Sequence, residues 1–88
     1  MYRISTAVRS TQHDDGALVL DIQQGQIYSL NVVGSRILEL LKSDASESQI
    51  ADEISHDFNV DRDTVAVDVQ DFLRLLAEHK LIEELREP

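Results

Sequence analysis

The sequence contains no cysteine and no tryptophan, and it has only one proline and three glycines among its 88 residues. Without cysteine the chain can form neither a disulfide framework nor a thiolate metal site, so a reducing compartment is the simplest expectation. No apolar run approaches the ~20 residues that a membrane-spanning helix needs. Residues 1–6 also lack the apolar core of a signal peptide. We therefore expect a cytoplasmic protein with no membrane partner.

The sequence also lacks the motifs on which catalysis commonly depends. Its three glycines are isolated and form no phosphate-binding loop, and no serine stands in a Gly-x-Ser-x-Gly elbow. Of the three histidines, His13 belongs to a polar turn, while His56 and His79 lie near helix ends, where a cationic ring suits the helix dipole. We therefore predict that the protein is not an enzyme and has no metal and no cofactor.

Basic residues are few, and the charge is distributed unevenly. Seventeen acidic residues against eight basic ones give a formal net charge of −9. Residues 1–42 contain four acids and four bases, so the whole excess lies in residues 43–88. An acidic half favours a basic partner and disfavours nucleic acid or an anionic membrane, although plain solubility explains the excess equally well.

The remaining composition is that of a folded protein. Hydrophobic residues make up 42% of the chain, enough for one modest core. No repeat or low-complexity linker divides the sequence, and we predict a single domain over residues 1–88.

Residues 17–22 and 26–30 each have the pattern of a strand, and a weaker strand in residues 4–9 is expected to pair with the first of them. One face of the strand at 17–22 is expected to consist of Leu18, Leu20 and Ile22.

Two registers are compatible with the turn between the two stronger strands. A two-residue turn pairs Ile22 with Ile27, whereas a three-residue loop with a left-handed glycine pairs Leu20 with Tyr28. We prefer the second register because it leaves only Val19 and Ile27, among the large residues, on the opposite face.

Three helices are expected after the strands. Asn31 suits the N-cap of the first, Ser46 and Gln49 form a capping box for the second, and Asp61 or Asp63 caps the third. The apolar positions expected in the core are Val33, Ile37, Leu40, Leu41, Ile50, Ala51, Ile54, Val65, Val69, Phe72, Leu73, Leu76, Leu81 and Ile82. This order predicts an α+β, winged helix-turn-helix-like fold, in which three helices follow a three-stranded antiparallel sheet.

Helix-turn-helix geometry raises the question of DNA binding. The third helix would read the major groove with its first turns, which carry Asp61, Asp63, Asp68 and Asp71 against the single base Arg62. Because DNA affinity depends on neutralising phosphates with several lysines or arginines, we expect no nucleic-acid partner.

The run from Leu18 to Asn31 combines a hydrophobic strand, a glycine turn, an aromatic residue and a Leu-Asn pair that leads into a helix. This pattern resembles the PqqD-like family, also called RiPP recognition elements, and the similarity extends over residues 5–83. The chain departs from the family where Val33-Gly34 replaces a common Thr-Ala pair. It also lacks a common glycine at residues 42–44 and another at residues 79–80.

The resemblance implies a binding function. Members of this family bind the leader segment of a ribosomally synthesised precursor peptide as an added strand and deliver it to a separate processing enzyme. A short stand-alone chain with this pattern looks most like the version found in lasso-peptide biosynthesis, which serves a leader peptidase. The alternatives are a peptide chaperone for a radical SAM enzyme, as in pyrroloquinoline quinone synthesis, and a non-catalytic scaffold.

A three-stranded sheet leaves two edges, so either the first or the third strand could carry the peptide. The resemblance selects the third and places the candidate peptide-binding site between the strand at 26–30 and the third helix. An uncovered edge of that strand would pair with the leader backbone, and side-chain pockets would supply specificity. On the helix, Asp68 and Leu75 lie on the flank of the apolar stripe, where they would form a groove wall, although Leu75 packing under the last turn explains its position equally well. Asp68 and Asp71 are expected to attract a basic leader residue.

The residues predicted to bind the peptide are Gln26, Ile27, Tyr28, Ser29, Leu30, Asp68, Val69, Asp71, Phe72, Leu75 and Leu76. Of these, Ile27 is expected to be exposed, and Tyr28 is expected to belong to the core. Because a free strand edge also permits pairing with a second copy, a monomer and an edge-paired homodimer both remain open.

Overall fold

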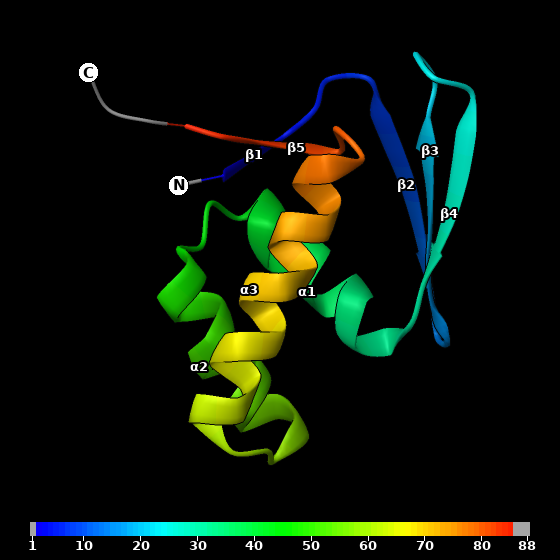
Figure 1. Cartoon of the computed structure of the whole chain (residues 1–88). Coiled ribbons are helices and arrows are strands. Elements are labelled where there is room, and N and C mark those ends of the chain that lie inside the picture. The colour runs from blue at the N-terminus through cyan, green and yellow to red at the C-terminus, as the bar shows by residue number, and fades with distance from the viewer. Residues whose placement is uncertain (1, 86–88) are drawn as a thin grey trace.

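Four strands precede three helices and a fifth strand follows them in the computed structural model, which describes residues 2–85. The strands are β1 Tyr2–Ile4, β2 Val8–His13, β3 Gly16–Asp21, β4 Gln26–Leu30 and β5 Ile82–Glu84. The helices are α1 Val32–Lys42, α2 Glu47–Phe58 and α3 Arg62–Glu78. Strands β2, β3 and β4 form an antiparallel sheet in that order, and the helices lie on one side of it (Figure 1). This confirms the predicted α+β architecture of three strands followed by three helices.

The weak strand predicted at residues 4–9 is wrong, because the chain turns in the middle of that range. The amide N–H of Val8 donates to the carbonyl oxygen of Ser5 at 3.1 Å, and this turn separates β1 from β2. Strand β2 pairs with β3 as expected, whereas β1 pairs antiparallel with β5, with Ile4 opposite Ile82. The second, two-stranded sheet therefore joins the two ends of the described chain.

The register between β3 and β4 differs from both predicted registers. Val19 lies opposite Tyr28 and Leu20 lies opposite Ile27, so the connecting loop has four residues, 22–25. Val19 is only 1% exposed and faces the helices, whereas Leu18 and Leu20 are 49% and 38% exposed on the other face. The face expected to consist of Leu18, Leu20 and Ile22 is thus the outer face. Ile27 is exposed as predicted, and Tyr28, predicted to belong to the core, packs against it but is only partly buried.

The reason for this register is the buried carboxylate of Asp21. It accepts hydrogen bonds from the backbone N–H groups of Gln23 and Gln24, both at 3.0 Å, and from the Gln24 side chain at 2.6 Å. Gly25 closes the loop in the predicted left-handed conformation, with φ of 67°, and donates its N–H to the Asp21 carbonyl oxygen. Because Asp21 must face inward to order this loop, Val19 faces inward with it.

Small residues at the start of β3 allow a close approach to the end of β4. Gly16 has φ of 143°, and a Cβ atom at this position would overlap the carbonyl oxygen of Leu30. Ala17 is fully buried opposite Leu30. The end of β4 and the beginning of α1 are therefore held directly against β3.

Local capping sets the ends of the helices as the sequence predicts. The Asn31 side chain accepts from the Gly34 N–H at 2.8 Å, and Ser46 and Gln49 form the reciprocal capping box at the start of α2. Asp61, and not Asp63, is the N-cap of α3. The buried apolar residues of the core are Ala17, Val19, Ile37, Leu38, Leu41, Ile50, Ala51, Ile54, Val65, Val69, Leu73, Leu76, Leu81 and Ile82. Ala17, Val19 and Leu38 were not predicted. Of the predicted core residues, Leu40 and Phe72 are only partly buried, and the prediction for Val33 is wrong, because this residue in the first turn of α1 is 36% exposed at the surface.

An ion-pair cluster joins α1 to α2. The Arg36 guanidinium donates to the Asp57 carboxylate at 2.9 Å and lies 3.3 Å from Glu39 and 3.7 Å from Glu53. This hydrogen bond from Arg36 holds the pKa of Asp57 below its usual value.

The inward position of Val19 and the outward position of Leu20 are testable with two alanine variants in β3. We expect Val19→Ala to lower the free energy of unfolding by about 2 kcal/mol, because it truncates a filled core position. Leu20→Ala should cost less than about 1 kcal/mol, because its side chain lies partly in solvent. Urea denaturation measures both values. A larger loss for Leu20→Ala than for Val19→Ala would contradict the register.

The Arg36–Asp57 pair predicts a specific acid sensitivity. Because the pKa of Asp57 is lowered on folding, the pair stabilises the fold above the unfolded-state pKa, and this contribution disappears as the pH falls through the folded-state pKa. Between about pH 5 and pH 2, Arg36→Gln should therefore lose less stability than the wild type. Arg74→Gln is the control, since Arg74 lies 3.8 Å from Asp71 in an exposed pair. If the free energy of unfolding falls equally with pH in Arg36→Gln and in the wild type, Arg36 does not lower the pKa of Asp57.

Candidate functional site

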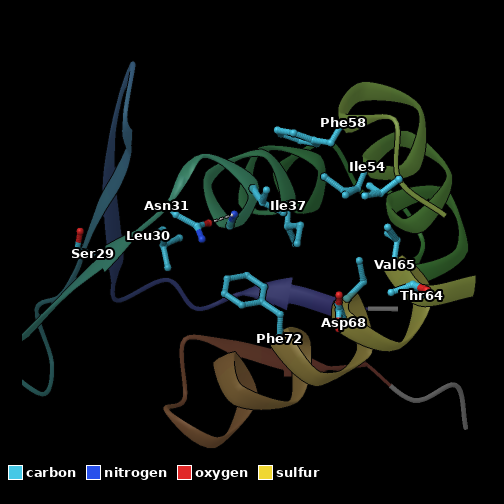
Figure 2. A pocket seen from close by; sticks show the side chains of 14 residues that line it. Ser29, Leu30, Asn31, Ile37, Ile54, Phe58, Thr64, Val65, Asp68 and Phe72 are labelled. Carbon is cyan, nitrogen blue, oxygen red and sulfur yellow. Dashed lines mark hydrogen bonds between the residues drawn. The ribbon is translucent and has the colours of Figure 1, made fainter. Parts of the chain in front are cut away.

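An apolar cleft of about 480 Å³ lies where the end of β4 meets the three helices (Figure 2). Its lining residues are Ser29, Leu30, Asn31, Val33, Gly34, Ile37, Ile54, Phe58, Val60, Thr64, Val65, Asp68, Val69 and Phe72. The volume falls within the range of about 300–1,000 Å³ typical of ligand pockets.

Apolar side chains from different elements face one another across this cleft. Leu30 from β4 and Phe72 from α3 point toward each other, and Phe58 lies farther along, at the end of α2 (Figure 2). Gly34 makes the narrow end possible, because a Cβ atom there would lie 3.2 Å from the Cζ atom of Phe72. Phe58 and Val60 remain partly exposed at the cleft, so a ligand can reach apolar surface without any opening of the core.

Asp68 is the one charged residue among those that line the cleft. It lies on α3 one turn before Phe72 and is exposed, and among residues 2–85 it takes part in no salt bridge. The neighbouring polar side chains have local partners: Asn31 caps α1, and the Thr64 hydroxyl donates to Asp61 at 3.1 Å. The Asp68 carboxylate is therefore available to a basic group that enters beside the apolar surface.

Strand β4 forms an edge of its sheet beside the cleft. It pairs with β3 on one side, and within the described range 2–85 no other strand pairs with it. Backbone N–H and C=O groups along such an edge can bind an extended chain. Tyr28 and Leu30 face the helices from this strand, whereas Ile27 and Ser29 belong to its other face.

The strand is tied to α3 at the end away from the cleft. The ring centroids of Tyr28 and His79 are 5.3 Å apart, and the Gln24 side chain donates to the His79 carbonyl oxygen at 3.2 Å. These contacts hold the loop after β3 and the start of β4 against the C-terminal end of α3. The cleft lies at the opposite end of β4, beside the first half of α3 (Figure 2).

The structure brings five of the predicted site residues into the cleft lining: Ser29, Leu30, Asp68, Val69 and Phe72. The remaining six lie outside it: Gln26, Ile27, Tyr28, Asp71, Leu75 and Leu76. Val69 and Leu76 are buried, so each can contribute only as packing beneath the surface. Leu75 is exposed instead of packing under the last turn of α3. Peptide binding by this set of residues stays a prediction.

Sequence reasoning missed the part of the cleft that comes from α2 and the start of α3. Phe58, Val60 and Thr64 line it, together with Val33 and Gly34 at the start of α1. The available signal was the pair of apolar residues Phe58 and Val60 on either side of Asn59, which ends α2 in the left-handed conformation. Helical periodicity assigns no core position to apolar residues that flank the end of a helix. Here these two residues form an exposed wall of the cleft.

Among residues 2–85 no group of three or more His, Asp or Glu side chains is arranged to hold a metal ion. None of the helices described here has the length and apolar character needed to cross a bilayer.

Comparison with known proteins identifies the fold and its relatives. Residues 16–82 match the family model described as coenzyme PQQ synthesis protein D (PqqD). No curated protein matches the chain.

Two solved structures are similar over nearly the whole length. One is TbiB1 in complex with the TbiA(beta) leader peptide, which is 41% identical with a TM-score of 0.89, over 97% of this chain and 99% of that one. The other is lasso peptide synthetase B1 complexed with the leader peptide, at 22% identity and a TM-score of 0.85, over 94% of this chain and 98% of that one. Because the family model spans most of the sequence and the 41% identical relative covers almost all of it, the chain belongs to the PqqD family, as its sequence pattern predicts.

Proposed function

We propose that this protein binds the leader segment of a ribosomally synthesised precursor peptide and presents it to a separate processing enzyme. The observation that carries this proposal is the unpaired edge of β4 beside an apolar cleft. The 41% identical relative supports it, since that protein was solved in complex with a leader peptide.

Backbone pairing would supply the part of the affinity that does not depend on the amino-acid sequence of the leader. An extended leader that lies along β4 adds a fourth strand to the sheet, and its backbone groups pair with the free edge independently of side-chain identity. The preformed sheet keeps the ordering cost on the protein side low, so most of the entropic cost falls on the leader.

The cleft would supply selectivity. Side chains of an added strand alternate between the two faces of the sheet, so every second leader residue points to the side of Leu30 and Phe72. Apolar leader residues fit this surface, and a Lys or Arg in the leader would pair with Asp68. Such a charge at the rim would act more on the association rate and its salt dependence than on the final affinity.

The partner we favour is the leader peptidase of a lasso-peptide pathway, because one structural relative is described as a lasso peptide synthetase B1. The second candidate is a peptide chaperone for a radical SAM enzyme, which the family description as a PQQ synthesis protein favours. In both cases this chain contributes binding in the cytoplasm, and the partner enzyme carries out the chemistry.

Fluorescence polarisation with a labelled leader peptide tests the binding. The probes are the leader of the precursor encoded beside this protein and the TbiA(beta) leader, with a DNA duplex as a control. We expect saturable binding to a leader and none to DNA. Val60→Asp should weaken leader binding at least about tenfold, because it places a charge in the apolar cleft.

Val67→Asp is the matched control for this series. Val60 and Val67 are 47% and 57% exposed, and only Val60 lines the cleft, so the two variants add the same charge at similarly exposed positions. Val67→Asp should change the affinity by no more than about twofold. Equal effects of the two variants would show that the leader does not use the cleft.

A scan of the leader with single N-methyl groups tests strand addition directly. Only alternate residues of a paired strand direct their N–H toward the neighbouring edge, so affinity losses should recur at every second position within the bound segment. Losses that recur every three to four residues would indicate a helix in the groove instead.

A further inference from the structure

A second groove lies on the other side of helix α1 from the cleft. It has a volume of about 410 Å³ and is formed by the turn that joins β2 to β3, one face of α1 and the end of α2. We call it the side groove, and its lining includes Gln12, His13, Asp14, Val32, Arg36 and Phe58. The residues of α1 that line the cleft are different ones, so the helix separates the two cavities.

Phe58 connects the side groove to the cleft. It is the last residue of α2, and it lines both cavities. Phe58 is 36% exposed, and Val32, the first residue of α1, adds a 46% exposed apolar side chain within the side groove. A chain that leaves the cleft past Phe58 therefore meets further apolar surface at the first turn of α1.

Hydrogen bonds hold the side groove in shape. The Gln12 side-chain nitrogen donates to the carbonyl oxygen of Ser35 at 3.1 Å and to its hydroxyl oxygen at 3.2 Å, and this joins the end of β2 to α1. Within residues 2–85 the side-chain oxygen of Gln12 accepts no hydrogen bond, so it can accept one from the backbone of a ligand.

The charge of the side groove favours a basic ligand. Its one arginine, Arg36, is already surrounded by three carboxylates at 2.9 to 3.7 Å, those of Glu39, Glu53 and Asp57. Asp14 also lines the side groove, and across the described part of the chain it takes part in no salt bridge. A lysine or arginine can therefore pair with Asp14, whereas an anion would meet carboxylates that outnumber the single guanidinium.

The direction of the sheet determines which part of a leader reaches the side groove. All pairs among β2, β3 and β4 are antiparallel, and an added strand that continues this pattern runs antiparallel to β4. Since β4 runs from Gln26 to Leu30, the paired part of such a leader begins beside Leu30. Leu30 lies opposite Ala17, at the end of the sheet where the β2–β3 turn lies and where α1 begins (Figure 1). The leader residues that precede the paired segment therefore lie close to both cavities.

We propose that the side groove is a second subsite for the leader and binds the residues that precede the strand-paired segment. An apolar leader side chain covers Val32 and Phe58, and a lysine or arginine pairs with Asp14. This inference rests on the proposed function, because it extends the same ligand beyond the cleft. The two contacts belong to one chain, so even a weak contact in the side groove raises the affinity through a high effective concentration.

A double-mutant cycle on the full chain tests the subsite. The probe is the leader of the precursor encoded beside this protein, labelled at its C-terminal end. It is used at full length and in a truncated form that lacks the residues before the paired segment, which the N-methyl scan locates. Truncation should weaken binding to the wild type at least about fivefold, and Val32→Arg should weaken binding of the full-length leader by a similar factor. Val32→Arg should change the affinity for the truncated leader by no more than about twofold, because its contact is already lost.

Asp14→Lys is a second variant that leaves the helices unchanged. It should weaken binding of the full-length leader at least about fivefold, again without an effect on the truncated form. Asp15→Lys is its matched control, since it makes the same charge change in the same turn at a residue that does not line the side groove. Val67→Arg is the control for Val32→Arg, because Val67 is 57% exposed and lines neither cavity. Both controls should stay within about twofold of the wild type, and thermal denaturation establishes that each variant is folded.

Failure of the subsite and failure of the proposed function give different results. If truncation and both variants leave the affinity unchanged while Val60→Asp weakens binding, the side groove is not used and the proposed function stands. If Val32→Arg weakens both lengths of leader equally, it acts on the cleft and the subsite is wrong. If removal of the residues after the paired segment, instead of those before it, abolishes the effects of the variants, the leader runs parallel to β4 and the assignment is overturned. If the wild type binds neither length of leader, the proposed function fails, and the subsite fails with it.

Discussion

The buried carboxylate of Asp21 is the interaction on which the two faces of the sheet depend. A carboxylate removed from water needs full hydrogen bonding, and here two backbone N–H groups and the Gln24 amide provide it. No buried side-chain polar atom of the described residues lacks a partner. The Gln24 amide also donates to the His79 carbonyl oxygen, so the same small network joins the β3–β4 loop to the end of α3.

Strand β4 is held at both ends, and the Asp21 network acts at one of them. Near the loop it holds the sheet against α3, with Tyr28 beside His79. At the far end Gly16 and Ala17 bring Leu30 close to β3, and the chain enters α1 immediately through the Asn31 cap. The strand is therefore positioned at both ends, and the cleft between Leu30 and Phe72 is preformed (Figure 2). A preformed edge beside a preformed pocket suits capture of a flexible peptide, because only the peptide must become ordered.

The orientation of β3 also separates two surfaces of a small protein. Val19 faces the helices, while Leu18 and Leu20 face outward on a sheet that carries almost none of the chain's acidic excess. The acidic residues lie largely on the helices, with Asp68 at the cleft. A leader bound along β4 would lie at the boundary between these two surfaces.

The sequence by itself determined the features that depend on local interactions. Helix starts at Asn31, Ser46 and Asp61 follow from side chains that bond backbone groups three residues away. The predicted apolar positions of α2 and α3 are buried, except for Phe72, which is partly buried. The family pattern in residues 18–31 was also visible without a structure.

Only the tertiary structure decided the register of β3 with β4, the pairing of β1 with β5 and the lining of the cleft. A strand has a period of two, so its alternate residues can face either side, and hydrophobicity favoured Leu18 and Leu20 over Val19 for the core. The inward position of Asp21, and the close contacts at Gly16, reverse that preference. Phe58 and Val60 line the same cleft as Phe72 only because α2 packs against α3, and no local pattern encodes the proximity of helices that are separate in the chain.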